Sequence, residues 1–409
     1  MKWFGRKRIY LDYASAPPVL PQATAAMHEA EKCIGNPGAI HREGAAAKKS
    51  LENSRARIAG LLGCKARELI FTSGLTESNN LAIIGYAKYL EQLRRGLKGT
   101  HWLVSSIEHD SVLESFTEVE RMGGIVSHVE PDERGIISAE AVGRALHPET
   151  VFVSVGWANN EIGTVQPLAK IAQKIHEHEQ HTSQTCVHKS DLCTCVRKMI
   201  FHSDAGQTPL YLPTVINSLG VDLLSLGGNK LYGPHGIGAL YVSNDIGLAP
   251  VIFGGKQERG LRAGTESVAL AAGFAAAFEV VSKERKVEKG RLKSLRDSLA
   301  RELTAQIPNL IVNGDLSRAL PHMLNVSIPA IQSEYVTLAL DAAGIAVSTK
   351  SACREGEESR SHVVAALGGE AWRAANTIRF SLGRDTTDRD VRKTVRALVH
   401  ILSTNKRMR

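Results

Sequence analysis

The chain alternates between short apolar runs and longer stretches in which apolar residues recur with helical spacing. The short runs are rich in β-branched and aromatic residues and lie at 68–72, 102–105, 125–129, 151–155, 199–202, 222–226 and 239–242. Helical stretches or loops separate most of them, at 77–97, 111–121, 139–146 and 167–177. This order is typical of an α/β protein with a mostly parallel sheet, whose ligand sites lie at the carboxyl ends of the strands.

The two ends of the chain depart from this alternation. Residues 9–18 form a short extended segment, because Pro17 and Pro18 prevent it from running straight into a helix. Helical patterns follow at 21–33 and 42–62, and a long one at 267–307 leads into a second α/β region that reaches residue 409. We therefore expect a large domain over 17–265 and a smaller α/β domain made of 1–16 and 266–409.

Residues 178–198 interrupt the pattern with a polar segment, HEQHTSQTCVHKSDLCTCVRK, that contains three cysteines and three histidines. A metal site is one interpretation of this composition. However, the spacing C-x-H-x4-C-x-C matches no standard arrangement of zinc ligands. The better prediction is a solvated, Cys/His-rich loop insertion that binds no metal.

Composition narrows the class of protein. With 409 residues, 43% of them hydrophobic, the chain can bury a large core. No run reaches the roughly 18 apolar residues that a membrane helix needs, and the basic start lacks the apolar stretch of a secretion signal. The net charge of +8 is scattered along the chain, so we expect no nucleic-acid partner. We expect a cytoplasmic protein whose six cysteines are reduced thiols.

One lysine, Lys230, stands among five glycines in the stretch SLGGNKLYGPHGIGALYV, directly after an apolar run. Glycines permit tight bends and close approach of a ligand. A lysine that such a bend presents in a cleft loses solvation, and its amine can condense with the aldehyde of pyridoxal 5′-phosphate (PLP). The alternative is an ordinary turn with a solvated lysine, and this motif alone does not decide between them.

Three further groups follow predicted strands. Leu75 and Thr76 open a helix whose amide groups and hydroxyl could hold a phosphate, although an ordinary helix cap would look the same. His109 could stack on a cofactor ring and transfer protons, or it could be a surface histidine. Asp204 could keep a pyridine nitrogen protonated, with Gln207 bonded to the ring hydroxyl, or Asp204 could cap a helix.

Cys353 is the candidate nucleophile. It precedes a run of charged and small residues, 354–360, that cannot pack, so we expect an exposed, mobile loop. Lys350 and Arg354 lie nearby in the sequence and would favour the thiolate over the thiol. The alternative is a surface thiol without function.

Taken together, these segments resemble the class V aminotransferase family and, within it, the cysteine desulfurases of the NifS and IscS type. YLDYASAPP is similar to the family's Y-L-D-Y-x-A-T-T-P, and GNPGAIHREG to its G-N-P-x-x-x-H-x-x-G. In the family order there follow FTSGLTESNN, IEHDSV, ANNEIGTVQP, HSDAGQ, NKLYGPHGIGALYV, QERGLRAGTESV, SAC and IRFSLGR. So many motifs in one order make the resemblance specific, and the alternatives for single motifs lose most of their weight.

The resemblance implies a PLP-dependent enzyme of fold type I, the fold of aspartate aminotransferase. It also implies a homodimer with active sites at the subunit interface. The residues that would hold the cofactor are Lys230 as the Schiff-base lysine, Asp204, Gln207, His109, Leu75, Thr76, Asn229 and, reaching the phosphate of the partner subunit, Thr265.

The resemblance also implies a reaction. Asn160 and Arg379 would bind the carboxylate of L-cysteine, and Cys353 would attack its sulfur, with Lys230 and His109 as the other catalytic residues. L-alanine would leave, and the persulfide on Cys353 would pass to an acceptor protein in iron–sulfur cluster assembly or in thiolation of tRNA or a cofactor. The alternatives are a selenocysteine lyase or aminotransferase of the same family, or a degenerate relative that carries sulfur without catalysis.

The sequence departs from the family pattern beside the lysine. Where the family has S-G-H-K, this chain has Gly227, Gly228, Asn229 and Lys230, so a hydroxyl and an imidazole that would contact the phosphate are replaced. Loss of a charge-assisted donor costs roughly 1 to 3 kcal/mol, and the Asn229 amide could still donate. We therefore predict weaker retention of PLP than is usual in the family. Lys350 also replaces a glycine.

Overall fold

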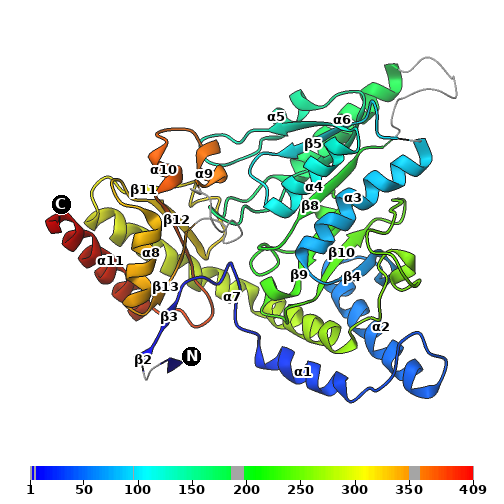
Figure 1. Ribbon diagram of the computed structural model, residues 1–409, viewed down its shortest axis with the longest axis horizontal. Coiled ribbons are helices and arrows are strands. Elements are labelled where there is room, and N and C mark those ends of the chain that lie inside the picture. Colours follow the sequence, from blue (N-terminus) through cyan, green and yellow to red (C-terminus); the bar gives the residue numbers. More distant parts are fainter. Residues whose placement is uncertain (1, 4–5, 95, 186–197, 350–359, 409) are drawn as a thin grey trace.

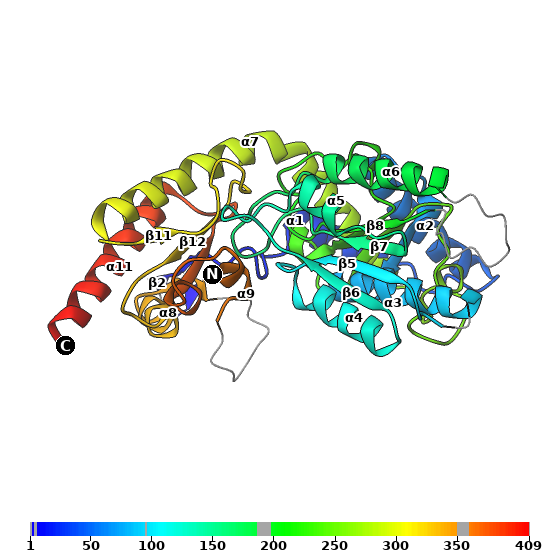
Figure 2. The same ribbon diagram turned by 90° about the horizontal axis from the view of Figure 1, so that it is seen from above.

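The computed structural model describes residues 2–3, 6–94, 96–185, 198–349 and 360–408. Within these residues, a larger sheet and a smaller sheet are connected by one long helix, α7 (Val268–Gln306), which runs past both (Figures 1 and 2). Helices α1 (Pro21–Glu31) and α2 (Arg42–Leu62) pack against α7. The predicted nucleophile Cys353 and the three cysteines of the 178–198 segment lie outside the described residues.

Seven strands of the described chain form the larger sheet, in the order β4-β10-β9-β8-β7-β5-β6. The strands are β4 (Leu69–Thr72), β5 (His101–Ser105), β6 (Ile125–Val129), β7 (Thr150–Ser154), β8 (Ile200–Asp204), β9 (Leu223–Gly227) and β10 (Gly238–Val242). Strands β5 to β9 are parallel to one another, whereas β10 is antiparallel to both β4 and β9. The seven short apolar runs each form one of these strands, and the prediction of a mostly parallel sheet is confirmed.

Four helices follow strands of the larger sheet: α3 (Leu75–Arg94), α4 (Asp110–Arg121), α5 (Ala139–Ala145) and α6 (Leu168–Thr185). The prediction that residues 178–198 form a loop from their start was wrong, because α6 continues through Thr185. No proline or glycine interrupts the polar stretch after residue 177, so the helix has no reason to end there. Glu179 within this stretch accepts a hydrogen bond from the Met199 N–H at 2.6 Å, which ties the helix to the start of β8.

The smaller sheet is antiparallel within the described residues and has the order β11-β12-β15-β14. Its strands are β11 (Ile311–Val312), β12 (Met323–Ser327), β14 (Ser348–Thr349) and β15 (Thr377–Ser381). Helices α8 (Ser333–Ala342) and α11 (Asp388–Met408) lie beside it, and α9 (His362–Ala366) and α10 (Trp372–Ala375) precede β15 (Figure 1).

The start of the chain lies with this C-terminal part. Strand β3 (Ile9–Tyr10) pairs in parallel with β13 (Ile345–Ala346), and the remaining short strands, β1 (Lys2–Trp3) and β2 (Arg6–Lys7), pair with each other. The residues after β3 then cross toward the larger sheet, because α1 packs on α7. The segment between β3 and α1 therefore passes between the two sheets. No helix in the described part of the chain is long and apolar enough to cross a membrane.

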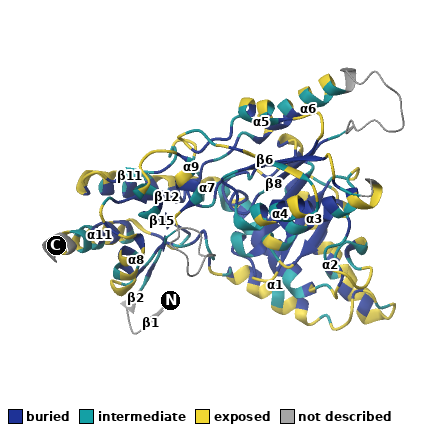
Figure 3. Ribbon diagram, turned by 45° about the horizontal axis from the view of Figure 1, so that its top comes forward, coloured by how far each residue is buried: buried dark blue, intermediate teal, exposed yellow. Residues whose placement is uncertain are grey.

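Most strands of the larger sheet are buried along their length, and only β6, at its edge, is largely exposed (Figure 3). On one face, Trp102 stacks on Phe152 with ring centroids 5.1 Å apart, and Phe116 of α4 meets both rings edge-on. Aromatic side chains bury large areas and gain further from such ring contacts. This cluster holds β5 and β7 against α4, and thereby fixes the loop between β5 and α4 where His109 lies.

Candidate active site

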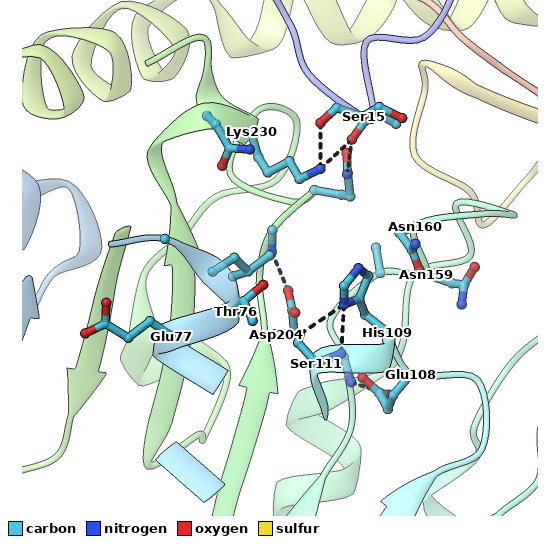
Figure 4. Close-up of a pocket in the computed structure, with 18 of the residues that line it drawn as sticks. Ser15, Thr76, Glu77, Glu108, His109, Ser111, Asn159, Asn160, Asp204 and Lys230 are labelled. Atoms are coloured by element: carbon cyan, nitrogen blue, oxygen red, sulfur yellow. Dashed lines mark hydrogen bonds between the residues drawn. The ribbon is translucent and has the colours of Figure 1, made fainter. Parts of the chain in front are cut away.

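A cavity of about 420 Å³ opens where the strands of the larger sheet end (Figure 4). Residues that follow β4, β5, β7, β8 and β9 line it, and Ser15 and Arg379 complete it from the side of the smaller sheet. The fold thus brings nine predicted site residues around one cavity: Leu75, Thr76, His109, Asn160, Asp204, Gln207, Asn229, Lys230 and Arg379. Their placement is as expected at the carboxyl ends of parallel strands.

Lys230 lies in a single 3₁₀ turn directly after β9. The turn is tight: a Cβ added to Gly228 would come within 2.8 Å of a side-chain carbon and close to two backbone oxygens, and Tyr232 adopts the left-handed conformation with φ 59° to end it. The Nζ of Lys230 donates hydrogen bonds to the carbonyl oxygens of Ala14 (2.9 Å) and Ser15 (2.8 Å). These carbonyls hold the amine at the cavity.

Asp204 is the last residue of β8. Its Oδ1 accepts a hydrogen bond from the Gly206 N–H, and its Oδ2 accepts one from the Asn79 side chain, both at 2.8 Å. These two hydrogen bonds fix the orientation of the carboxylate. Gln207, just beyond, donates from Nε2 to the Ala14 carbonyl at 2.9 Å and is nearly buried.

His109 precedes α4 and caps it, since its Nδ1 accepts a hydrogen bond from the Ser111 N–H. Its neighbour Glu108 also lines the cavity and is only 6% exposed. Burial raises the pKa of Glu108 to about 8; a hydrogen bond from the Gly156 N–H opposes this effect, and the charge of Asp204 adds to it. The cavity therefore holds at Glu108 a carboxyl group that keeps its proton at neutral pH, close to Asp204; Glu77, which also lines the cavity, is paired with Arg262.

Arg379 projects from β15 into the cavity and is buried. Its guanidinium donates to the backbone oxygen of Asn160 (2.8 Å), to Oδ1 of Asp12 (2.8 Å) and to Oγ of Ser15 (2.6 Å). The contact with Asn160 is thus made by the backbone of that residue. The guanidinium is the positive group that this side of the cavity offers to an anionic ligand, and Asp12 shares it.

Thr265 does not line this cavity. It borders a separate hollow of about 240 Å³, together with Glu258 and Arg262. The structure therefore does not bring Thr265 to the other predicted cofactor ligands of its own chain. Its predicted contact with a partner subunit stays a prediction, as does the role of Cys353.

Sequence reasoning missed Glu108, Asn79, Ser111, Asp12 and Ser15. Each stands within or next to a motif that contains a predicted site residue, but the motif gives no sign of which neighbouring side chain turns toward the cavity. Asn79 and Asp204, for example, are 125 positions apart and meet only because α3 starts beside the end of β8. The sequence signal that could have indicated them is the number of polar residues that stand directly beside the predicted site residues.

Comparison with known proteins places the chain in a family. Residues 9–394 match the family described as aminotransferase class-V. The chain belongs to the class-V aminotransferase family. A relative named cysteine desulfurase IscS, from Dictyoglomus turgidum, is 36% identical, with 97% of this chain and 95% of the relative aligned. A Bacillus subtilis protein named putative cysteine desulfurase IscS 1 is 37% identical, with 98% and 100% aligned.

Solved structures of this family have the same fold. A NifS-like protein superposes with a TM-score of 0.86 at 29% identity, and covers 97% of this chain and 100% of its own. A structure described as SspA in complex with cysteine gives a TM-score of 0.76 at 32% identity, with 92% and 99% covered. The predicted fold class, the PLP-dependent fold of type I, is confirmed.

Class-V aminotransferases of this kind use PLP, and the residues around the cavity fit that cofactor. At the start of α3, the amide groups of Leu75 and Thr76 donate to no residue in the part of the chain that the structure describes, so they can donate hydrogen bonds to a phosphate. Asp204 can pair with a protonated ring nitrogen, and the Nζ of Lys230 lies at the cavity for the aldehyde.

Proposed function

We propose that this chain is a PLP-dependent cysteine desulfurase, which takes sulfur from L-cysteine and releases L-alanine. The observation that supports this most is the gathering of nine predicted residues around one cavity, in a chain that aligns over 97% of its length with a protein named cysteine desulfurase. The alternative activities within the family have no observation of their own in their favour.

The residues of the cavity divide the work. PLP, when bound, supplies an electron sink for charge that develops on the substrate carbon. Asp204, held by Asn79 and Gly206, keeps the ring nitrogen protonated. Lys230 binds the cofactor through Nζ and afterwards holds or moves a proton there, and the start of α3 binds the phosphate.

Arg379 orients the substrate through its carboxylate. The guanidinium can engage a carboxylate with two parallel hydrogen bonds, and the loop at Asn160 closes that side of the cavity. Asp12 and Ser15 occupy one edge of the guanidinium, so a bound carboxylate must share or displace these contacts. Substrates without a carboxylate gain nothing from this arrangement.

Cys353 accepts the sulfur. Its thiolate attacks the cysteine sulfur, the carbon–sulfur bond of the substrate breaks, and a proton replaces sulfur on the carbon that becomes alanine. The outer sulfur of the resulting Cys353 persulfide then passes to an acceptor protein in iron–sulfur cluster assembly or a thiolation pathway. We further propose a cytoplasmic homodimer in which Thr265 reaches the phosphate of the partner subunit, with domains at 17–265 and at 1–16 with 266–409.

Replacement of Cys353 by alanine tests this function. The variant should keep PLP but form no more alanine from L-cysteine than a boiled sample, whereas Cys33→Ala, which changes a half-buried thiol just after α1, should remain active. Full desulfuration by Cys353→Ala would contradict the proposal, because the reaction would then not need the Cys353 thiol. That result would favour a selenocysteine lyase or an aminotransferase, which need no such thiol. Failure of the unaltered protein to take up added PLP would instead indicate the degenerate relative.

A further inference from the structure

A chain of hydrogen bonds runs from Asp204 to His109 through two residues without an assigned role. The side-chain nitrogen of Asn79 donates to Oδ2 of Asp204 (2.8 Å) and to Oγ of Ser111 (2.9 Å). Oγ of Ser111 lies 2.9 Å from Nδ1 of His109 (Figure 4). Asn79, on α3, is fully buried, and Ser111 stands in the first turn of α4, so both are held by the scaffold.

The chemistry of each group sets the direction of every bond in this chain. An ionised carboxylate can only accept, so Asn79 must turn its amide nitrogen, not its oxygen, toward Asp204. The two hydrogens of that nitrogen serve Asp204 and Ser111, while the Asn79 Oδ1 has no partner within the described residues. The Ser111 hydroxyl therefore accepts from Asn79, and its own hydrogen is left for His109.

The backbone gives the same answer for the histidine. The Ser111 N–H, whose hydrogen position is fixed by the peptide plane, donates to Nδ1 of His109 at 3.1 Å. Two hydrogens thus point at Nδ1, which must present its lone pair. With the hydroxyl and the amide both directed at Nδ1, a hydrogen on that nitrogen would have no acceptor.

The other ring nitrogen then carries the hydrogen. Nε2 of His109 makes no hydrogen bond with any residue that the structure describes, and in Figure 4 it points into the cavity on the side of Lys230. His109 therefore presents an N–H donor to whatever occupies the cavity. Nε2 cannot at the same time accept a proton from a substrate.

We propose that Asn79 and Ser111 are positioning residues that hold His109 in the Nε2–H tautomer, so that the histidine serves the reaction as a hydrogen-bond donor and Lys230 is left as the base. The part of His109 in the reaction rests on the proposed function, whereas the assignment of its tautomer does not. The ionised Asp204 starts the chain, so the group that pairs with the cofactor nitrogen also sets the hydrogen on the histidine.

The tautomer is measured directly by long-range ¹H–¹⁵N NMR on PLP-loaded protein labelled with ring-¹⁵N histidine. The His109 signals are assigned by their loss in His109→Gln. We expect a bare Nδ1 and a protonated Nε2 at neutral pH, unchanged in Ser111→Thr, which keeps the hydroxyl. Ser111→Ala removes the hydroxyl hydrogen, and Asn79→Leu frees the hydroxyl to turn and accept instead. Only the longer contact from the amide of residue 111 then favours a bare Nδ1, so an Nδ1–H tautomer should appear beside the Nε2–H tautomer in both variants. A protonated Nδ1 in the unaltered protein, or a pure Nε2–H tautomer in both variants, would overturn the proposal.

Kinetics give a second readout. Ser111→Ala should lower kcat for alanine formation about tenfold, a part of the 10²- to 10⁴-fold that a positioned proton-handling group contributes, with KM changed by less than about twofold. Ser111→Thr should restore kcat. An unchanged kcat in Ser111→Ala would contradict the part of the proposal that gives the His109 tautomer a role in the reaction. If the unaltered protein made no alanine but showed the expected tautomer, the proposed function would fail and the inference about His109 would stand.

Discussion

Glu108 should make the stability of this protein fall as the pH rises, and Glu108→Gln should remove that dependence. Glu108 is 6% exposed, and its Oε1 accepts a hydrogen bond from the Gly156 N–H at 2.8 Å. Burial is the largest influence on its pKa and raises it from 4.5 to about 8. Hydrogen bonds with Gly156 and Ser105 lower the pKa, but they do not cancel the effect of burial. The nearby charge of Asp204 raises the pKa further.

The sign and size follow from proton linkage. Between pH 4.5 and about 8 the folded protein keeps the Glu108 proton that the unfolded chain releases. The stabilisation is therefore complete below pH 4.5 and is lost as the pH rises through about 8. At about 1.4 kcal/mol per pH unit, the whole difference is on the order of 5 kcal/mol. The glutamine side chain is neutral at every pH and releases no proton, so it adds no such pH dependence.

Urea unfolding of the PLP-loaded protein at several pH values between 5 and 9 (roughly the window in which the shift acts) measures this effect. The free energy of unfolding of Glu108→Gln minus that of the unaltered protein should grow with pH by several kcal/mol. Glu177→Gln, which changes an exposed carboxylate on α6, is the control and should give a flat difference. A flat difference for Glu108→Gln as well would refute the description of Glu108 as a buried neutral acid.

Three further predictions concern other parts of the molecule. Glu258→Gln should lower the free energy of unfolding by about 3 to 5 kcal/mol in urea titrations, because it removes the buried negative charge beside Arg55 and one of the two oxygens that accept from its guanidinium (2.6 and 2.7 Å), and leaves the more exposed Glu52 as the carboxylate partner. Arg379→Lys should raise the KM for L-cysteine roughly tenfold with a smaller change in kcat, since a lysine cannot grip a carboxylate at two points. Extended dialysis should remove PLP from this protein faster than from Asn229→His, measured by absorbance of the bound cofactor. Equal retention would contradict the prediction that asparagine in place of the family's histidine at position 229 weakens PLP binding.

The larger sheet could be predicted from the sequence because each buried strand is a short apolar run bounded by turns. The parallel order followed from the helices between those runs. The antiparallel placement of β10 could not be predicted, because β9 and β10 are joined by the glycine-rich segment around Lys230 and periodicity does not show how that segment turns. The continuation of α6 through Thr185 was missed because polarity was taken as a sign of a loop, although no residue there ends a helix.

The candidate site divides in the same way. The placement of Lys230, Asp204 and His109 at one cavity could be predicted, because each stands at or just after the end of a strand in a recognisable motif. Asn79 and Ser111 could not, since their partners depend on the angle at which α3 and α4 leave the sheet. Such contacts are long-range, and a single sequence carries no record of them.

The most direct test of the account is to find where PLP attaches. Borohydride treatment of the PLP-loaded protein fixes the cofactor to its lysine, and digestion followed by mass spectrometry locates it. We expect the cofactor on the peptide that contains Lys230, and no labelled peptide at that position in Lys230→Ala. Attachment to a different lysine, or no attachment in protein saturated with PLP, would contradict the assignment of the cavity.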